Sequence, residues 1–336
     1  MSRTLHVIGN GFDIANGVRS SYRDFREYLM GQGPDGVRLV KSLESCLGGA
    51  PDLWGDFEES LASMDRGRAM DSVDAAMGRS PEGHMGDDRV RDSVDEGLAD
   101  MLDIEASLPI QFFRWLCTLK AEGPVWQCPV PLDPEGRFIS FNYTDILESR
   151  YGIPRDRIMY IHGSVARGSG SIVMGHGGDP ERMLSDWMES VRGDPMYLPY
   201  VEEDGVSCRN TRLSAQAYGD YRVDDCEWGC DGRFRAMGIA SRLIEEYFGA
   251  TAKRCDEVIA RNSAYFGSLH DVDRVVLIGH SLSTVDLPYF ERILECSDDP
   301  GAIRWEIGYH SRKARAEAFA ERLGLDPSAV TYYCTM

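Results

Sequence analysis

Short apolar runs bounded by glycine or polar residues recur along the chain and predict the strands of a sheet. Four runs end directly in a polar or glycine-containing turn; they cover residues 5–8, 137–141, 157–161 and 274–278. A fifth run, 302–309, follows a helix-like stretch over 287–295. Runs of this length that are rich in β-branched and aromatic residues are typical of strands in an open α/β sheet.

Two long intervals between these runs carry a helical pattern instead. In the first, apolar residues recur at helical spacing over 54–64 and 94–106, and a polar loop over 78–88 separates them. The second interval begins at residue 180 with a part rich in Gly, Asp and Arg that is expected to be irregular, and continues with an expected helical part over 234–266. The pattern predicts an α/β fold of Rossmann type, a parallel sheet flanked by helices, with mainly helical insertions.

We expect a single α/β domain over residues 1–336, a length that can bury a large core. Its core segments are expected at 1–30, 131–179 and 268–336. The helical insertions are expected at about 31–130 and 180–267. The turns that follow the first four strands all belong to the core segments.

Acidic residues dominate the charge balance: 55 Asp and Glu against 36 Lys and Arg give a formal net charge of −19. Extended binding to nucleic acid needs a dense Lys and Arg surface, so no nucleic-acid partner is expected. One small anionic ligand is still compatible with this charge, because backbone N–H groups at a helix start hold phosphate without side-chain charge.

The apolar stretches and the cysteines indicate a cytoplasmic protein. No stretch approaches the roughly 20 apolar residues that a membrane-spanning helix needs, so no membrane partner is expected, and the start of the chain is interpreted as a core strand rather than a signal peptide. Nine cysteines at irregular intervals are typical of mostly buried free thiols in a reducing compartment. Cys226 and Cys230 are the only close pair, and without a second pair no metal site is expected.

The first strand runs into the turn Gly9-Asn10-Gly11-Phe12-Asp13, which is expected to open a helix. Ligands of open α/β sheets bind at the carboxyl ends of strands, where the chain turns. The two glycines permit a close backbone approach to a phosphate, so Gly11→Val is expected to block the ligand and to leave the fold largely intact. The dinucleotide fingerprint needs a third glycine where this chain has Ile14, so the ordinary fingerprint is absent and a plain tight turn is the alternative.

Residues 9–25 resemble the opening motif of AbiH proteins, a Gly-Asn-Gly-Phe-Asp turn followed by Ser-Tyr-x-x-Phe. They also resemble the sirtuin opening, although Arg19 stands where sirtuins have proline. Residues 140–145, Ser-Phe-Asn-Tyr-Thr-Asp, are similar to the AbiH Phe-Asn-Tyr-Thr motif and to the sirtuin Thr-Gln-Asn-Ile-Asp motif. The His-Gly pair at 162–163 and the Gly-His-Ser-Leu loop at 279–282 resemble the sirtuin pair with the catalytic histidine and the loop beside the bound dinucleotide.

The resemblance covers about half of the chain and implies a phage-defence protein of the abortive infection type with a sirtuin-like NAD-binding core. Trp54, Phe57 and Glu58 also fit an AbiH-like Trp-x-x-x-Glu helix, whereas the zinc ribbon of deacetylating sirtuins is missing. The implied activity is hydrolysis of NAD to nicotinamide and ADP-ribose in infected cells, and the implied partners are a phage-derived trigger or further copies of the chain. The residues implied to hold the nucleotide are Gly9, Asn10, Gly11, Phe12, Asp13, His176, Gly279, His280, Ser281 and Asp286.

Asn142 and His162 are the catalytic candidates. Breaking the bond between nicotinamide and ribose requires an oriented ribose and a base near its hydroxyls rather than a proton for the leaving group. An amide can hold a ribose hydroxyl and an attacking water together, and an imidazole, whose ordinary pKa is about 6.5, can accept a hydroxyl proton. The alternatives are that Asn142 caps the next helix, that His162 is a core histidine, and that Asp13 caps the first helix rather than holding a ribose hydroxyl.

Two other functions compete with NAD hydrolysis. A non-catalytic nucleotide sensor uses the same pocket and gates a partner. A serine hydrolase uses Ser281 as the nucleophile on a Gly-x-Ser turn, with Asp286 and His310 following in the order of a catalytic triad. Against the hydrolase, Ser283 replaces the second glycine of the nucleophile turn, and Asp286 lies only five residues after the serine.

Overall fold

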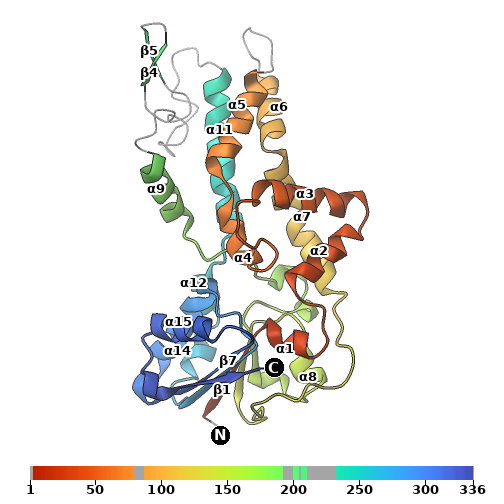
Figure 1. Cartoon of the computed structure of the whole chain (residues 1–336), viewed down its shortest axis with the longest axis vertical. Helices are drawn as coiled ribbons and strands as arrows, with labels where there is room; N and C mark the ends of the chain where they lie inside the picture. Colours follow the sequence, from red (N-terminus) through yellow and green to blue (C-terminus); the bar gives the residue numbers. More distant parts are fainter. Residues whose placement is uncertain (1–2, 79–86, 192–199, 204–205, 210–231, 336) are drawn as a thin grey trace. The chain divides into compact units, whose positions relative to one another are not determined.

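A computed structural model describes residues 3–78, 87–191, 200–203, 206–209 and 232–335, and in it all six strands of the largest sheet run parallel. The strands lie in the order β3-β2-β1-β6-β7-β8 (Figure 1). Counted within the sheet, this is the order 3-2-1-4-5-6 of doubly wound dinucleotide-binding folds, which bind ligands at the carboxyl ends of the strands where the order reverses. Here the reversal lies between β1 and β6. The strands are β1 (Thr4–Ile8), β2 (Arg137–Ser140), β3 (Ile158–Tyr160), β6 (Arg274–Ile278), β7 (Arg304–Tyr309) and β8 (Val330–Cys334).

The five predicted strands are confirmed, each within two residues of its expected ends, and so is the helix that precedes β7, α14 (Leu287–Cys296). The pattern does not predict β8. Among the strands that the structure describes, it lies at the edge of the sheet and pairs with β7 alone, and none of its five residues is buried. An edge strand with little buried surface has no continuous apolar run by which it could be identified.

Side chains alternate along the strands between two cores, one on each face of the sheet. On one face, Leu5 and Val7 of β1 pack in a core with α12 (Cys255–Arg261), α13 (Ser263–Gly267), α14 and α15 (Lys313–Arg322). On the other face, Ile8 packs in a core with α1 (Asn10–Ala15) and α8 (Ile146–Ser149). Figure 1 shows α12, α14 and α15 on one side of the strands and α1 and α8 on the other. Because both faces are covered, the central strands are apolar at most positions.

The chain divides into two compact units. The unit that holds the sheet comprises residues 1–28, 110–177 and 253–336, and the other comprises 29–109 and 178–252. The second and third core segments were predicted to begin at residues 131 and 268. The corresponding segments of the sheet unit begin earlier, at residues 110 and 253. It therefore includes the end of α7 (Ala99–Leu116) and all of α12 and α13.

The second unit is mainly helical, and within it α5, α6 and α11 pack against one another. A short antiparallel hairpin, β4 (Tyr200–Glu203) and β5 (Val206–Arg209), also belongs to this unit. Of the four boundaries between the units, two fall within α2 (Tyr22–Met30) and α7, and two fall outside helices, after residues 177 and 252. The other helices are α3 (Pro34–Cys46), α4 (Phe57–Ser60), α5 (Arg66–Gly78), α6 (Asp87–Gly97), α9 (Pro180–Val191) and α11 (Gly232–Ala250).

The helix predicted over 54–64 is wrong in extent. Only the single turn α4 is α-helical, and a 3-10 turn over Leu61–Ser63 follows it. Before α4, the Asp52 carboxylate accepts the N–H of Gly55 at 3.0 Å and holds this stretch as a turn. A side chain that bonds its own backbone in this way competes with helix formation.

The irregular structure expected after residue 180 is also wrong, because α9 and the β4–β5 hairpin occupy part of it. Met183, Leu184 and Trp187 recur at helical spacing within α9, and the Asp179 carboxylate accepts the N–H of Glu181 at its start. The surrounding Gly and Asp residues hide this short apolar stripe in the sequence. Residues 79–86 of the expected loop, and Cys226 and Cys230, lie outside the described residues.

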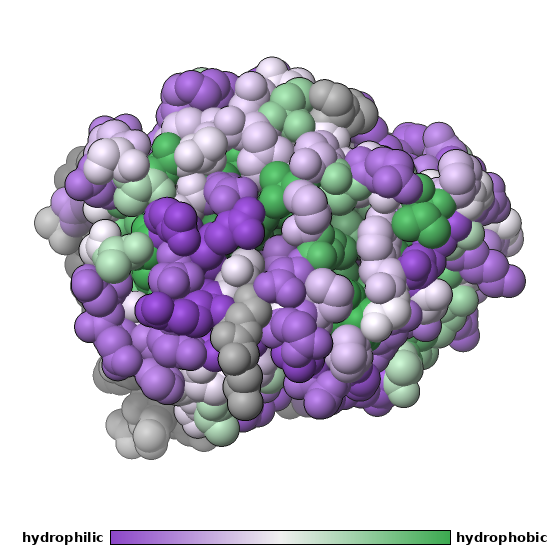
Figure 2. All heavy atoms as spheres, turned by 90° about the horizontal axis from the view of Figure 1, so that it is seen from below, coloured by the Kyte–Doolittle hydropathy of each residue, from purple (hydrophilic) through white to green (hydrophobic). Residues whose placement is uncertain are grey.

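Every helix in the described part of the chain is too short or too polar to span a membrane. On the face drawn in Figure 2, polar residues are widespread and apolar residues are scattered among them.

Six cysteines among the described residues are free thiols, but only Cys255 is buried, so the expectation of mostly buried thiols is wrong for this part.

Candidate functional site

The turns after β3, β2, β1 and β6 lie side by side at the carboxyl edge of the sheet, because these four strands are consecutive in it. The Nδ2 of Asn142, after β2, donates to the carbonyl oxygen of Gly9, after β1, at 3.1 Å. The N–H of Gly11 donates to the carbonyl oxygen of Gly279, after β6, at 2.7 Å. The structure thus brings three of the four predicted turns into direct contact.

Gly9, Gly11 and Gly279 pack against one another where the strand order reverses. A Cβ atom on Gly11 would lie 2.8 Å from the Cα of Gly279, and a Cβ atom on Gly279 would collide with the backbone nitrogen of Phe12. Gly279 also has a φ of +66°, which side chains rarely allow. The expectation that Gly11→Val leaves the fold largely intact is therefore wrong: the space beside Gly11 holds the backbone of the neighbouring turn, and the Gly11 N–H is already used there.

Asp13 holds the turn after β2 through two hydrogen bonds. Its Oδ1 accepts from Asn142 Nδ2 at 2.6 Å, and its Oδ2 accepts from Thr144 Oγ1 at 2.6 Å. Asp13 does not cap α1, whose N-cap is Gly9 without a side-chain bond. Burial raises the pKa of Asp13 to about 7, although the hydrogen bonds from Thr144 and Asn142 act in the opposite direction.

The two polar atoms of the Asn142 amide differ in their contacts. Its Nδ2 is fixed by Gly9 and Asp13, so its Oδ1 must point away from both. This Oδ1 is buried and has no hydrogen-bond partner among the described residues. The helix-cap alternative for Asn142 is wrong, because the N-cap of α8 is Asp145. A buried acceptor without a donor costs about 1–3 kcal/mol, which a ligand hydroxyl or a water can recover.

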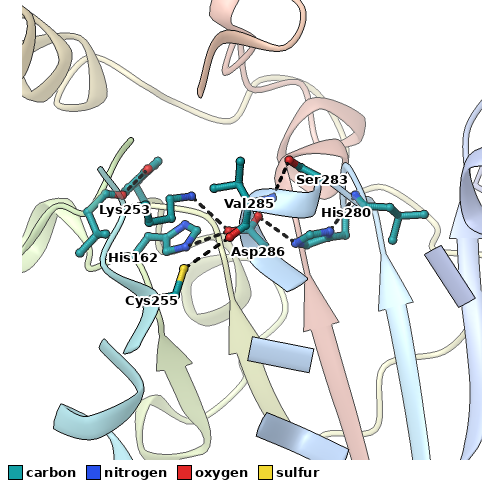
Figure 3. A network of polar contacts seen from close by, with 10 residues as sticks. His162, Lys253, Cys255, His280, Ser283, Val285 and Asp286 are labelled. Atoms are coloured by element: carbon teal, nitrogen blue, oxygen red, sulfur yellow. Dashed lines mark hydrogen bonds and ion pairs between the residues drawn. The ribbon is translucent and has the colours of Figure 1, made fainter. Parts of the chain in front are cut away.

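His162, after β3, belongs to a buried cluster centred on Asp286 (Figure 3). The Nε2 of His162 lies 3.4 Å from Asp286 Oδ1, and the Nζ of Lys253 lies 3.1 Å from the same oxygen. The Nε2 of His280 lies 3.5 Å from Asp286 Oδ2. Phe141 lies edge-to-face against both imidazole rings, with centroids 5.0 Å from His162 and 4.4 Å from His280. Figure 3 shows this cluster at the arrowheads of the strands, which are their carboxyl ends.

Asp286 is a carboxylate in this cluster. Burial by itself would raise its pKa, but the Lys253 ammonium and the neighbouring imidazoles of His162 and His280 together hold the pKa well below its usual range. Lys253 has no exposed side-chain surface, and a Lys–Asp pair buried to this degree pays a large desolvation cost. The cluster places two imidazoles, a carboxylate and an ammonium at one edge, which is a set of groups suited to proton transfer.

The remaining predicted ligand residues differ in position. Asn10 is exposed and bonds the Ser20 backbone and hydroxyl, so it closes the loop after α1. Phe12 is buried against Trp126 and Tyr151 and is a core residue rather than an edge residue. His176 is buried, and its carbonyl oxygen accepts the N–H of Lys253 at 2.7 Å.

The structure does not assemble the serine hydrolase triad. Ser281 and His310 are both exposed, and neither side chain makes a hydrogen bond within the described part of the chain. Asp286, the acid of the expected triad, is engaged by Lys253 and two histidines instead. Ser281 is therefore an exposed polar group at the edge of the site rather than an activated nucleophile.

Two residues of the site were not predicted from the sequence. Thr144 is part of the Phe-Asn-Tyr-Thr motif, so the motif itself contained the signal. Lys253 lies far from any motif, but it is one of only four lysines in a chain with 32 arginines. The rarity of lysine in this chain is therefore a weak sequence signal for Lys253.

One cavity lies apart from the predicted site residues. A cavity of about 390 Å³ in the sheet unit is lined by residues of α2, the end of α7 and adjacent loops, and Arg19 at its edge is paired with Asp24 and Glu27. Over the ranges that the structure describes, no group of three or more His, Cys, Asp or Glu residues is arranged to hold a metal ion.

Residues 5–309 match the model of a protein family described as bacteriophage abortive infection AbiH. The match includes every residue of the carboxyl-edge site described above. Comparison with curated proteins and with solved structures finds no match.

Proposed function

The chain belongs to the AbiH family of bacteriophage abortive infection proteins, and from this premise we propose that it acts in anti-phage defence by hydrolysing NAD, or a related nucleotide, at the carboxyl edge of its sheet. Three features support the proposal. The strand order is that of dinucleotide-binding sheets. The four turns that resemble sirtuin motifs are neighbours at that edge, and the two proposed catalytic residues follow adjacent strands.

The observation that carries the proposal is the oriented amide of Asn142. Two hydrogen bonds fix its Nδ2, and its buried Oδ1 is left without a donor among the described residues. A ribose hydroxyl is a donor of the right kind for this oxygen. In a sirtuin-like reaction this contact holds the ribose while the bond to nicotinamide breaks.

The proposed reaction consumes one water. The water oxygen bonds to the ribose carbon C1′, and the electron pair of the bond between C1′ and nicotinamide leaves with nicotinamide. The water proton passes to His162 by way of a ribose hydroxyl and then to solvent. Nicotinamide leaves without protonation, so the site needs a base and an oriented ribose but no general acid.

The test is release of nicotinamide from NAD by the purified chain. We expect Asn142→Ala and His162→Ala each to lower the rate by about 10²–10⁴ while NAD still binds, because loss of a positioned base or orienting group acts on the reaction step. Asn262→Ala and His270→Ala are the matched controls, since Asn262 caps the end of α12 and His270 is an exposed partner of Asp298. Full turnover by His162→Ala would make the assignment of the base wrong.

A non-catalytic nucleotide sensor is the second candidate, and the burial of the catalytic pair favours it. Asn142 is 4% and His162 3% exposed, so a site that turns over substrate must open in every cycle. The sensor predicts that the wild-type chain releases no nicotinamide, in vitro or in infected cells, while Asn142→Ala still abolishes protection against phage.

A further inference from the structure

Three donors from three separate segments converge on the Asp286 carboxylate. Lys253 precedes α12, His162 follows β3 and His280 follows β6. All four side chains are at most 7% exposed. Beside them, the thiol of Cys255 donates to the carbonyl oxygen of Val285 at 3.4 Å, and Figure 3 shows this bond next to Asp286.

The hydrogen bond of His280 indicates which imidazole tautomer this arrangement selects. Its Nδ1 accepts the backbone N–H of Leu282 at 2.9 Å, so the neutral ring must carry its proton on Nε2, the atom that faces Asp286. His162 has the same orientation, with Nε2 toward Asp286 and its ring edge-to-face with Phe141. An ionised carboxylate can only accept, so an attractive contact at 3.4 Å requires the proton on Nε2 of His162 as well.

We propose that Asp286 and Lys253 are positioning residues that hold His162 in the tautomer with its proton on Nε2, which makes Nδ1 the basic atom of the ring. This inference rests on the proposed function for the role of His162 as a base. The contact of 3.4 Å between His162 Nε2 and Asp286 Oδ1 lies outside hydrogen-bond geometry, so the preference rests on the electrostatic attraction between the carboxylate and an N–H at this separation.

Lys253 supplies the cation of the cluster, and its charge lowers the pKa of the buried Asp286 carboxyl more than either imidazole does. Without the ammonium, burial favours the protonated acid, which donates a hydrogen bond and can reverse the tautomer of the histidine it contacts. A buried ion pair is often no more stabilising than an apolar pair of similar size. Its presence at the end of the sheet beside His162 is therefore better explained by control of the imidazole than by stability alone.

The first measurement is the tautomer of His162 in the wild-type chain, read from the imidazole nitrogens by NMR after labelling histidine with ¹⁵N. His162→Gln identifies the resonances among the seven histidines of the chain. We expect the proton on Nε2. A proton on Nδ1, or a ring protonated on both nitrogens at neutral pH, overturns the proposal whether or not the chain cleaves NAD.

The second measurement uses the double variant Lys253→Met with Asp286→Val, which replaces the ion pair by apolar side chains closer in volume and is expected to fold. We expect His162 to lose its single tautomer and nicotinamide release to fall by at least about 10²-fold. The matched control is Arg274→Met with Glu306→Leu, which removes an ion pair of 2.7 Å between β6 and β7, and it should change neither reading.

The outcomes separate the two proposals. If the double variant keeps the Nε2 tautomer, Lys253 and Asp286 do not position His162 and the inference is wrong. If the double variant does not fold, the tautomer of His162 in the wild-type chain still tests the inference. A third outcome is that the wild-type chain releases no nicotinamide, yet its His162 has the Nε2 tautomer and the double variant loses it. In that case the proposed function fails and the positioning role stands.

Discussion

At the scale of single residues, buried polar side chains define the site, and each is oriented by a second group. Asp13 orients the amide of Asn142 through a bond of 2.6 Å, and Asp286 faces the imidazole of His162. Buried groups of this kind are costly when they lose a partner, because they cannot return to water. The neighbours of the two acids differ in charge. The Lys253 ammonium contacts Asp286, whereas the donors that contact Asp13 are the neutral side chains of Asn142 and Thr144.

The absence of a cation beside Asp13, within the described residues, predicts a pH dependence of stability. Its pKa is about 7 in the folded chain against 3.8 as the ordinary value. The folded state therefore keeps a proton that the unfolded state loses, so this contribution to stability is complete below about pH 4 and is lost as the pH rises through 7. At about 1.4 kcal/mol per pKa unit, the effect is at most about 4 kcal/mol.

Asp13→Asn removes this titration. The free energy of unfolding of each chain is measured with urea. We expect the value for the wild-type chain minus the value for Asp13→Asn to decrease as the pH rises from 4 to 7. Carboxyl ¹³C NMR of Asp13 should show a midpoint near 7. A difference between the two chains that does not change with pH would show that burial does not control this carboxyl.

At the scale of elements, the close contact of β1, α1 and β6 depends on glycine. Gly9 and Gly11 at the start of α1 lie directly against Gly279 after β6, and Gly11 donates its N–H across this contact. The contact sets the distance between the two turns where the strand order reverses. The glycines therefore serve first to bring two backbones together, and any ligand must bind beside this contact rather than within it.

Gly279→Ala is expected to lower the free energy of unfolding by more than about 2 kcal/mol, because the new Cβ adds both a strained φ and a collision with Phe12. Gly170→Ala is the matched control, since a Cβ at Gly170 meets no atom within 4 Å and its φ is not positive. It should stay within about 1 kcal/mol of the wild-type chain. Equal unfolding midpoints in urea for the two variants would show that the glycine contact is not needed.

At the scale of the whole molecule, the net charge of −19 sets the electrostatic behaviour. Like charges on a folded chain repel one another and oppose the compact state. The buried pair of Lys253 and Asp286 is shielded from solvent ions, whereas most of the other ion pairs are partly exposed. Added salt should therefore act mainly on the general repulsion and on weak surface pairs.

We expect the melting temperature at pH 7.5 to rise as NaCl increases from about 0.01 to about 0.15 M, which shortens the Debye length from about 30 to about 8 Å. The same salt series near the isoelectric point of about 4.8 serves as the control, and there the rise should disappear. A melting temperature that falls with salt at pH 7.5 would show that exposed ion pairs outweigh the repulsion between like charges.

The sequence by itself determined the strands and the turns that carry the site. Five strands follow from local apolar runs, because a strand buried on both faces needs apolar side chains at successive positions. The turns with Gly9, Asn142, His162 and Gly279 follow from motifs that directly succeed those runs. The edge strand β8 and the short helix α9 were missed, since little burial or a short stripe leaves only a weak local pattern.

Only the tertiary structure decided which side chains pair within the site. Asn142 bonds Asp13 across 129 positions, and Lys253 bonds Asp286 across 33. Local patterns contain no information on such pairs, because the pairs depend on the strand order β3-β2-β1-β6, which brings distant turns together. For the same reason the sequence did not show that the space beside Gly11 is filled by Gly279, a contact that exists only once β1 and β6 are neighbours.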